Sequence, residues 1–410
     1  MSTGVTSYAG LTTGPFRLPQ IQYDLMKEQE QNALGKGSWA IVGPGCLLRE
    51  SEFSNTNHRL RIISPLFPSI NEVSAFAPDG EKIFIFDNNP NLIGFLSHCQ
   101  KNCPPFIKSL DQNAINNCFQ QFNNVDSKLS AVFNFLKHNA NKHLEDDSII
   151  PIQHDITRGP IQLTERRKLN KIFVTFVLCN ISEKETALLS LLSSLKNRGT
   201  LYIDHNNDYA SYLTSVFEQI SSYGLEVSEE ILPIMASSKD SYIIPNHSGP
   251  TTSFPDIRSV DGTIITKVSA DKVLKIRLEF PALTLADTKS FRNNTSEYWL
   301  ARANEVKNLT DRAKAQLDVV KVKTTTIATA SKHHQWTPLH IAAIRLNHSI
   351  LEYFATVLPK SSWRKKDEFG KTPINYYKTA YILNEHSSFE ESARKAQLNM
   401  ETLINKFQSS

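Results

Sequence analysis

Short apolar runs alternate with longer amphipathic segments through the first part of the chain. The apolar runs have the length of strands, and glycine, aspartate or asparagine follows most of them, as expected where a chain turns. The predicted strands are Trp39–Val42, Lys82–Phe86, Ile149–Gln153, Lys171–Cys179, Thr200–Ile203, Leu225–Met235 and Ser241–Ile244. The predicted helices are Asn91–Gln100, Asn113–His143, Ser182–Leu195 and Tyr209–Tyr223. This alternation predicts an α/β fold with a mostly parallel sheet and helices on both faces.

The residues that follow the predicted strands are candidates for a binding site, because ligands of open parallel sheets lie outside the carboxyl ends of the strands. These residues are Gly43, Gly45, Asp87, Asp155, Asn180 and Asp204. Glycine lets the backbone approach a ligand closely, and aspartate can accept hydrogen bonds from vicinal hydroxyls or an amine. A single strand-end aspartate can equally be a helix cap. The two glycines of W-A-I-V-G-P-G-C (Trp39–Cys46) can equally form a tight corner.

Composition narrows the class of protein. The chain has 410 residues, 40% hydrophobic and 21% charged, so two globular domains are expected. A net charge of +4 gives no electrostatic reason to expect nucleic acid or an anionic membrane as a partner. Residues 1–14 lack the pattern of a signal peptide, and no apolar run is long enough to span a bilayer. Five cysteines without paired C-x-x-C spacing indicate reduced thiols, no metal site and a cytoplasmic compartment.

Two further segments stand out in the sequence, Leu188–Asp204 and Phe176–Ser182. Both resemble segments of the Rossmann-like (class I) S-adenosylmethionine-dependent methyltransferases. Leu188–Asp204 (L-L-S-L-L-S-S-L-K-N-R-G-T-L-Y-I-D) is similar to that family's segment of helix, Leu-Lys-Pro-Gly-Gly turn, strand and acid. Phe176–Ser182 (F-V-L-C-N-I-S) is similar to its fourth strand and the following turn. The resemblance covers about Tyr23 to Asn246. It implies a mostly parallel seven-stranded sheet closed by an antiparallel hairpin, with S-adenosylmethionine as cofactor.

The resemblance also assigns residues to the cofactor by position. They are Gly43, Pro44 and Gly45 beside the methionine part, Asp87 and Asn88 at the ribose, Asp155 and Ile156 at the adenine, and Leu178, Cys179 and Asn180 next to the substrate. Because the sulfonium makes the methyl carbon electrophilic, the protein mainly has to align a nucleophile with it.

A catalytic base is needed only if the methyl acceptor arrives protonated. His205, which follows the fifth predicted strand, and Asn180 are the catalytic candidates. Asp204 lies next to His205, and His154 and His247 are more remote candidates. The alternative for each histidine is an ordinary surface or hydrogen-bonded residue.

Three features depart from the family's pattern. Ile41 stands where the family usually has an acid, and Leu47 replaces the third glycine of the turn. The chain between Gly43 and Asp87 is much longer than usual, so residues 51–78 are expected to form an insertion or an added element on the substrate side. These departures leave a second interpretation open, a catalytically inactive protein of the same fold.

The end of the chain resembles ankyrin repeats. Gln335–Ala343 (Q-W-T-P-L-H-I-A-A) contains the T-P-L-H-x-A-A signature, and Thr372 begins a weaker copy in which Asn375 replaces the histidine. Thr337 is expected to cap a helix, and Ser387–Phe407 to form a helix that seals the end. The resemblance implies a protein partner. The other interpretation is a structural appendage, because at least about three repeats are usually needed for stability.

These patterns divide the chain into four parts. They are a flexible N-terminus (1–22), a methyltransferase-like Rossmann domain (23–247), a linker with strands and a long helix (248–330), and ankyrin repeats with a capping helix (331–410). The hypothesis is methyl transfer to a protein or small-molecule acceptor. The resemblance extends to ankyrin-carrying effectors of intracellular bacteria, which would place the protein in a host cell cytosol. The alternative is an inactive protein that binds partners through the repeats.

Overall fold

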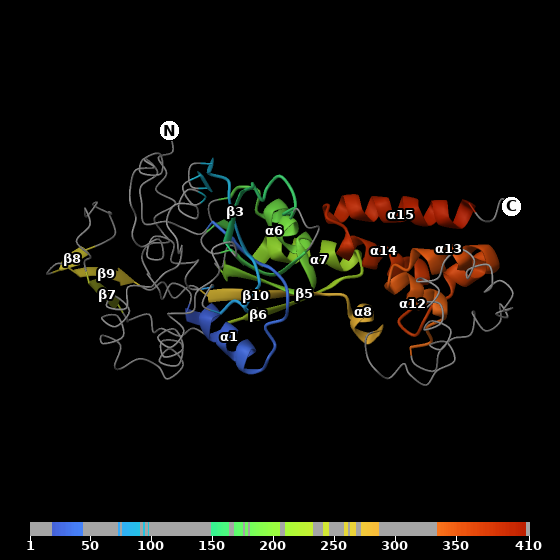
Figure 1. Ribbon diagram of the computed structural model, residues 1–410, viewed down its shortest axis with the longest axis horizontal. Helices are drawn as coiled ribbons and strands as arrows, with labels where there is room; N and C mark the ends of the chain where they lie inside the picture. The colour runs from blue at the N-terminus through green and yellow to red at the C-terminus, as the bar shows by residue number, and fades with distance from the viewer. Residues whose placement is uncertain are drawn as a thin grey trace. The chain divides into compact units, whose positions relative to one another are not determined.

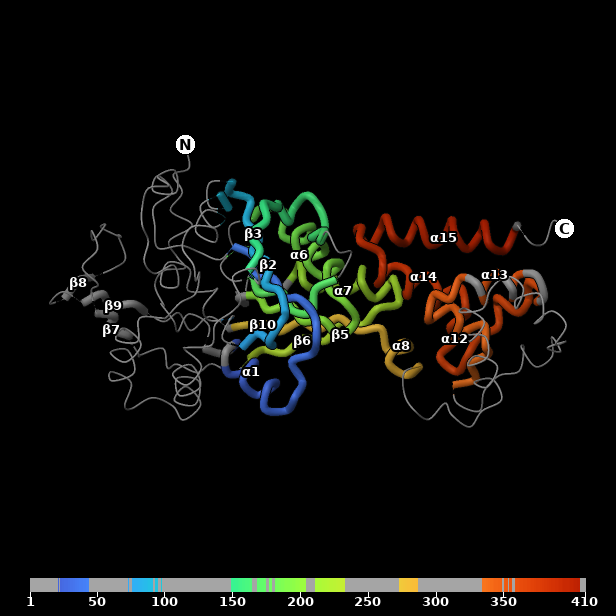
Figure 2. The backbone as a smooth tube through the Cα atoms, viewed as in Figure 1, coloured from blue at the N-terminus to red at the C-terminus, as the bar shows by residue number. Residues whose placement is uncertain are grey.

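The computed structural model divides the chain into two compact units (Figure 1 and Figure 2). The first comprises most of residues 1–277, and the second comprises residues 278–410 with the segments 196–198 and 214–227. The structure describes residues 19–43, 76–90, 149–163, 168–174, 181–205, 210–232, 241–245, 258–260, 263–267, 272–286 and 334–406, with residues 73, 93–94, 97 and 177–178. The predicted helix Asn113–His143 and most of Asn91–Gln100 lie outside these residues.

A seven-stranded sheet runs through the first unit. Its strands are β1 (Trp39–Val42), β2 (Ile83–Asp87), β3 (Ile149–Gln153), β4 (Leu169–Val174), β5 (Leu195–His205), β6 (Glu226–Ile231) and β10 (Lys272–Glu279). They lie in the order β3-β2-β1-β4-β5-β10-β6. The neighbours from β3 to β5 are parallel, and β10 is antiparallel to β5. The prediction of an α/β fold with a mostly parallel, seven-stranded sheet is therefore confirmed.

Helices lie on both faces of this sheet, because parallel strands need crossover connections. Between β4 and β5, α6 (Lys184–Ser193) buries Leu188, Leu191 and Leu192. The helix α1 (Pro19–Glu30) lies on the opposite face (Figure 1). The helix α7 (Ala210–Ser222) connects β5 to β6. The central strands β1 and β4 are buried at every position. This explains the continuous apolar run of β1, whereas β4 also buries the polar side chains of Asn170 and Lys171.

The last strands of the sheet differ from the prediction. Ser241–Ile244 was expected to close the sheet, but β7 (Ser241–Pro245) belongs to a separate three-stranded sheet with β9 (Thr263–Lys267) and β8 (Arg258–Val260), in the order β7-β9-β8. Its place beside β5 is taken by β10, which pairs with β5 from Lys272 to Arg277. β10 has eight residues, which is long enough for this pairing with β5. β7 has only five residues and ends in a proline, which cannot donate a hydrogen bond to a neighbouring strand.

The two edge strands of the seven-stranded sheet are β3 and β6. Near its middle, β3 carries Pro151, which has no N–H to donate. In β6 nearly every residue is exposed, including Glu226, Glu229 and Glu230. Both edges therefore contain residues that disfavour pairing with a further strand.

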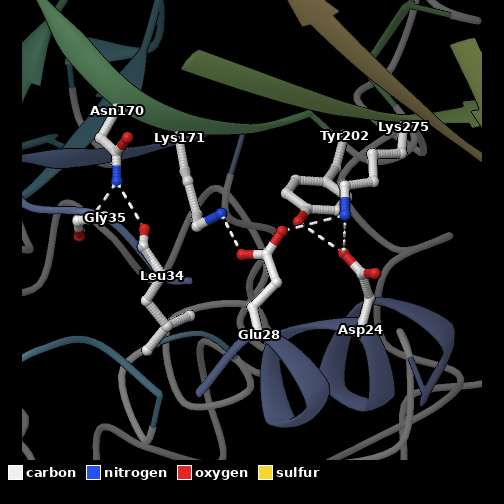
Figure 3. Close-up of polar contacts among 8 residues, drawn as sticks. All are labelled: Asp24, Glu28, Leu34, Gly35, Asn170, Lys171, Tyr202 and Lys275. Carbon is white, nitrogen blue, oxygen red and sulfur yellow. Dashed lines mark hydrogen bonds and ion pairs between the residues drawn. The ribbon is translucent and has the colours of Figure 1, made fainter. Parts of the chain in front are cut away.

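Two lysines on the sheet face that α1 covers, one buried and one half-buried, contact acidic partners (Figure 3). The side chain of Lys171 in β4 is 3% exposed, and its Nζ lies 2.5 Å from an oxygen of Glu28. The Nζ of Lys275 in β10 lies 2.7 Å from an oxygen of Asp24 and 2.9 Å from one of Glu28. The hydroxyl of Tyr202 donates to Asp24 at 2.7 Å. These five residues form the ionic network that fastens α1 to the sheet.

The environment sets the protonation of this ionic network. Burial by itself would raise the pKa of Glu28, but the charges and hydrogen bonds of Lys171 and Lys275 outweigh burial and lower this pKa. Burial is also the largest influence on Lys171, and it lowers the pKa of this lysine against the attraction of Glu28. Burial raises the pKa of Tyr202, so its hydroxyl keeps the proton that it donates. The carboxylate of Glu28 is the group that neutralises both lysines.

A second contact holds the turn that follows α1. The side-chain amide of Asn170 donates to the carbonyl of Leu34 at 2.8 Å and to that of Gly35 at 3.3 Å (Figure 3). Asn170 precedes Lys171 in β4. Successive residues of one central strand therefore hold the N-terminal helix and its connection to β1.

The second unit contains a series of packed helices. They are α8 (Pro281–Ala286), α12 (Pro338–Ile344), α13 (His348–Val357), the 3-10 helix η8 (Lys360–Arg364), α14 (Pro373–Asn384) and α15 (Phe389–Lys406). The helix α12 packs against α8, α13 and α14, and α14 packs against α15. The predicted helix Ser387–Phe407 is therefore present as α15. The interpretation of these helices as ankyrin repeats stays a prediction.

Both Thr-Pro pairs begin helices, as the sequence predicts. The N–H of Thr337 donates to Nδ1 of His340 at 3.1 Å at the start of α12. At the start of α14, the N–H of Thr372 donates to Oδ1 of Asn375 at 2.9 Å, and the N–H of Asn375 donates to the Thr372 hydroxyl at 3.2 Å. Asparagine therefore reproduces the capping contact of the histidine without a titratable group.

His340 is a buried, neutral histidine. Because its Nδ1 accepts from a backbone N–H, the ring proton lies on Nε2, which contacts the carbonyl of Lys365 at 3.1 Å. Burial, which outweighs the attraction of Asp367, lowers the pKa of His340 from 6.5 to about 4.

A buried carboxylate joins the loop before α14 to the helices. Asp367 accepts hydrogen bonds from Nε1 of Trp336 at 2.8 Å and from the hydroxyl of Tyr376 at 2.5 Å. Its other oxygen accepts from the N–H groups of Phe369 at 3.0 Å and Lys371 at 2.8 Å. Four donors compensate the burial of one charge, so this carboxylate fixes the loop and the start of α12 against α14.

Within the part of the chain that the structure describes, no helix combines the length and the apolar character needed to cross a membrane.

Glu28→Gln is expected to lower the free energy of unfolding by about 3 kcal/mol, because it leaves Lys171 buried without a full counter-ion. Adding Lys171→Met should recover most of this loss, since the double variant no longer buries that charge. Urea denaturation followed by tryptophan fluorescence measures both effects. Glu391→Gln is the control, because its ion pair with Lys395 is exposed and should matter little. A loss that Lys171→Met does not recover would contradict the assignment.

Acidification is expected to destabilise the second unit through His340. The unfolded chain takes up a proton at this histidine below about pH 6.5, and the folded chain only near pH 4, so stability falls as the pH decreases through this window. At about pH 5 the loss relative to about pH 7 should be about 2 kcal/mol. In urea titrations, His340→Gln should no longer show this loss of stability between about pH 7 and about pH 5. His348→Gln, at an exposed histidine, should still show it. Equal pH dependence in both variants would contradict the assignment.

Candidate functional site

The strand order reverses between β1 and β4. The chain proceeds from β1 to β2 and β3 on one side, then returns to place β4 and β5 on the other side of β1. In register, Val42 at the end of β1 pairs with Phe86 of β2 and Val174 of β4. The carboxyl ends of these strands therefore share one edge. In open α/β sheets, the crevice outside such a reversal is the usual place for a ligand.

Gly43 follows β1 at this reversal. Its φ is +62°, in the left-handed region that favours glycine, and its N–H donates to the carbonyl of Phe86 at 2.8 Å. A Cβ at this position would lie 2.3 Å from Cγ2 of Val177, in the turn after β4. Glycine is therefore required for the close approach of two turns of the chain. A ligand could contact this residue only through the backbone, because Val177 fills the side-chain direction.

Asp87 is the last residue of β2, one strand away from Gly43. Its Oδ1 accepts from the N–H of Asn89 at 2.9 Å, which makes a turn directly after the strand. Burial raises the pKa of Asp87, and the backbone N–H groups of Asn89 and Asn88 oppose this rise. The carboxyl group is thus partly withdrawn from water at the edge where the strands end.

The end of β3 supports this turn. The N–H of His154 donates to the carbonyl of Asp87 at 2.9 Å, and Nε2 of Gln153 donates to the carbonyl of Asn88 at 3.4 Å. The ring of His154 meets that of Phe86 edge-on, with 6.0 Å between their centres. Gln153 was not among the predicted site residues. The signal that could have found it is its position as the last, polar residue of an otherwise apolar strand.

Asp155 forms a local turn of its own. One of its oxygens accepts from the N–H of Thr157 at 3.0 Å and from the Thr157 hydroxyl at 2.7 Å, and the other lies 3.4 Å from Nε of Arg158. The hydrogen bonds of Thr157 lower the pKa of Asp155. The side chain of Ile156 is buried. Ile156 therefore offers only its backbone at the strand edge, and the Asp155 carboxylate is engaged mainly with Thr157.

The remaining candidates follow β4 and β5. Leu178 is fully buried, and its carbonyl accepts from the N–H of Ile181 at 3.3 Å. Asp204 and His205 end β5 and pair with Val273 and Lys272 of β10, respectively. The side chains of these two candidates lie outside the described residues.

Several predicted site residues cannot be placed. Those outside the described residues are Pro44, Gly45, Cys179, Asn180 and His247. The structure brings Gly43, Asp87 and His154 to one edge of the sheet through β1, β2 and β3.

No family model and no curated protein matches the chain. Among solved structures, a variant of the branched-chain polyamine synthase from Thermus thermophilus, solved with 5'-methylthioadenosine, is similar with 9% identity and a TM-score of 0.31 over 62% of this chain and 54% of that one. The N-methyltransferase NodS from Bradyrhizobium japonicum, with S-adenosyl-L-homocysteine, has 11% identity and a TM-score of 0.30 over 67% of this chain and 98% of that one.

Magnesium protoporphyrin IX methyltransferase from Synechocystis, with bound S-adenosylmethionine, has 10% identity and a TM-score of 0.26 over 63% of this chain and 78% of that one. The match thus spans about half of the synthase and nearly all of NodS. Since identities and TM-scores are low, the fold is inferred from the strand order, and the role of each residue from its own contacts.

Gly43→Ala is expected to lower the free energy of unfolding by about 2 kcal/mol, because alanine would combine a left-handed backbone with a clash against Val177. Adding Val177→Ala should recover the part of the loss that comes from the clash. Gly80→Ala is the control for backbone strain alone, since its φ is also positive but nothing lies near its Cβ direction. Thermal and urea denaturation compare the variants, and equal losses at positions 43 and 80 would contradict the close approach.

Proposed function

We propose that the protein is an S-adenosylmethionine-dependent methyltransferase. The observation that carries the proposal is the carboxylate of Asp87, half-buried at the end of β2 beside the reversal of strand order. A carboxylate in this place is suited to the vicinal hydroxyls of a ribose. The antiparallel β10 beside β5 supports the proposal, because the resemblance in the sequence implies an antiparallel hairpin at this end of the sheet.

The contacts of Asp87 leave room for such a ligand. A carboxylate has about four lone-pair positions for hydrogen bonds. The backbone N–H groups of Asn89 and Asn88 oppose the effect of burial as hydrogen-bond donors. The remaining acceptor positions can take two hydroxyls, while the contacts from β3 keep the turn in place.

Other parts of the chain have supporting roles in this proposal. The backbone of Gly43, with Pro44 and Gly45, would lie beside the methionine part of the cofactor. Leu178, Cys179 and Asn180 would line the side that faces the substrate. The adenine contact of Asp155 and Ile156 fits through the backbone, because the Asp155 carboxylate is engaged with Thr157 and the Ile156 side chain is buried.

The chemistry needs little beyond binding and alignment. When bound, the cofactor supplies a methyl group on a positively charged sulfur. The chain would position an acceptor atom in line with it. If that atom carries a proton, His205 at the end of β5 or Asn180 after β4 would assist its removal or orientation. The acceptor in this proposal is a protein or a small molecule.

Ile41 favours a second candidate function. It is 1% exposed in β1, at the position where the resemblance leads one to expect an acid. A buried isoleucine offers no hydrogen bond to a cofactor. The alternative is therefore an inactive protein of the same fold that binds partners through its C-terminal helices.

The C-terminal helices support an ankyrin-repeat module with a protein partner. Both Thr-Pro pairs begin helices with reciprocal capping, and α12 is followed by α13 after the turn that Asn347 caps. In this proposal the protein acts in the cytoplasm, or in the cytosol of a host cell as a secreted bacterial effector. Secretion is the part supported only by resemblance in the sequence.

Asp87→Ala is expected to weaken the binding of S-adenosyl-L-homocysteine by more than about tenfold, because two hydrogen bonds to the ribose are lost. Isothermal titration calorimetry measures the affinity, and circular dichroism checks that the sheet is intact. Glu229→Ala is the control, since this exposed carboxylate belongs to β6, at the edge of the sheet far from β2. Equal affinity in Asp87→Ala and the unmodified chain would show that the ribose lies elsewhere. An absence of binding at millimolar concentration would favour the inactive alternative.

A further inference from the structure

A cavity in the second unit is lined by lysines, whereas the strand-end site is centred on the carboxylate of Asp87. It has a volume of 270 Å³ and lies between the C-terminal end of α7 and one side of α14. Its lining residues all belong to the second unit. They include Lys371 and Lys378, and no aspartate or glutamate is among them. A concave surface with charges of one sign concentrates ions of the opposite sign.

One wall of the cavity favours an anion. Asn375, Lys378, Thr379 and Ile382 line it from α14, at the spacing of residues on one helix face. Lys371 precedes α14, so the two lysines flank the N-terminal part of a twelve-residue helix. The helix dipole adds positive potential at this end.

The opposite wall offers hydrogen-bond acceptors. It is formed by Ser222, Tyr223 and Gly224 at the end of α7, where carbonyl groups have no partner within the helix. The hydroxyl of Thr379 donates to the carbonyl of Tyr223 at 2.7 Å, so one of these carbonyls already accepts from a hydroxyl of α14. A ligand with hydroxyl groups could make the same kind of contact.

The buried acidic residue that precedes Lys371 in the chain is already satisfied. Asp367 is buried and accepts from four donors, one of which is the hydroxyl of Tyr376. Tyr376 lines the cavity, and Asp367 does not. The side chains of Lys371 and Lys378 are therefore the charged groups that a ligand in the cavity would meet.

We infer that this cavity binds a small phosphorylated polyol. The phosphate would lie between Lys371 and Lys378 at the start of α14, and the hydroxyls would donate to the carbonyls at the end of α7. The cavity volume of 270 Å³ corresponds to the volume of about nine water molecules. This space is larger than a bare phosphate needs and too small for a dinucleotide. This inference does not depend on the methyltransferase proposal.

Calorimetry on the full chain at low ionic strength tests the inference with three probes. Glycerol 3-phosphate should bind, inorganic phosphate should bind more weakly, and glycerol should not bind. Lys378→Met should weaken the binding of glycerol 3-phosphate by about tenfold. Lys366→Met is the matched control, because Lys366 is exposed and does not line the cavity. Asp87→Ala should bind this probe normally, which separates the cavity from the strand-end site.

Ala393→Met supplies a test without a change of charge. Ala393 lines the cavity from α15, so the larger side chain should occupy part of the space and weaken binding. Circular dichroism confirms that the variant folds. The inference is overturned if glycerol 3-phosphate does not bind to the unmodified chain, or if Lys366→Met weakens binding as much as Lys378→Met. It is also overturned if glycerol 3-phosphate binds no more tightly than inorganic phosphate.

Discussion

The burial of two ammonium groups on one face of the sheet is the constraint on which the first unit depends. Lys171 and Lys275 are mostly removed from water, and an isolated charge in such a place is strongly unfavourable. Asp24 and Glu28 neutralise them from successive turns of α1, which restricts the helix to one rotation and one height on the sheet. Lys171 belongs to β4, beside β1, so the same contacts hold the strands between which the order reverses. The geometry at the carboxyl ends of these strands depends on this attachment.

Much of the parallel part of the sheet is predictable from the sequence, because strands that are covered on both faces are apolar throughout. β1 and β3 have the predicted bounds, and β2 is displaced by one residue. The role of β10 could not be predicted, because Lys275 and Arg277 interrupt its apolar residues and nothing nearby in the sequence indicates that α1 provides a carboxylate for Lys275. In the same way, Lys171 stands at the start of the predicted strand, where a lysine is normally exposed.

The candidate site could be predicted only in part. The rule that ligands lie beyond strand ends identified Gly43 and Asp87, and the structure places them at the same edge. It did not reveal that Gly43 is needed for packing against Val177, because such a contact between distant parts of the chain leaves no local pattern. Asp155 has the same type of position as Asp87, but a hydroxyl two residues later engages its carboxylate. Nearby side chains therefore decide which strand-end acids can receive a ligand.

The outer strands of the sheet also bear on how copies of the chain meet. Association through sheet edges would require continuous backbone pairing between molecules. On one side, Pro151 removes a donor from the middle of β3 and interrupts any added ladder. On the other, two copies of β6 would bring glutamates together, and their mutual repulsion would oppose the union. At one edge the missing backbone donor disfavours pairing, and at the other edge the charge repulsion does. A fibre built by joining sheets edge to edge is therefore disfavoured at both edges.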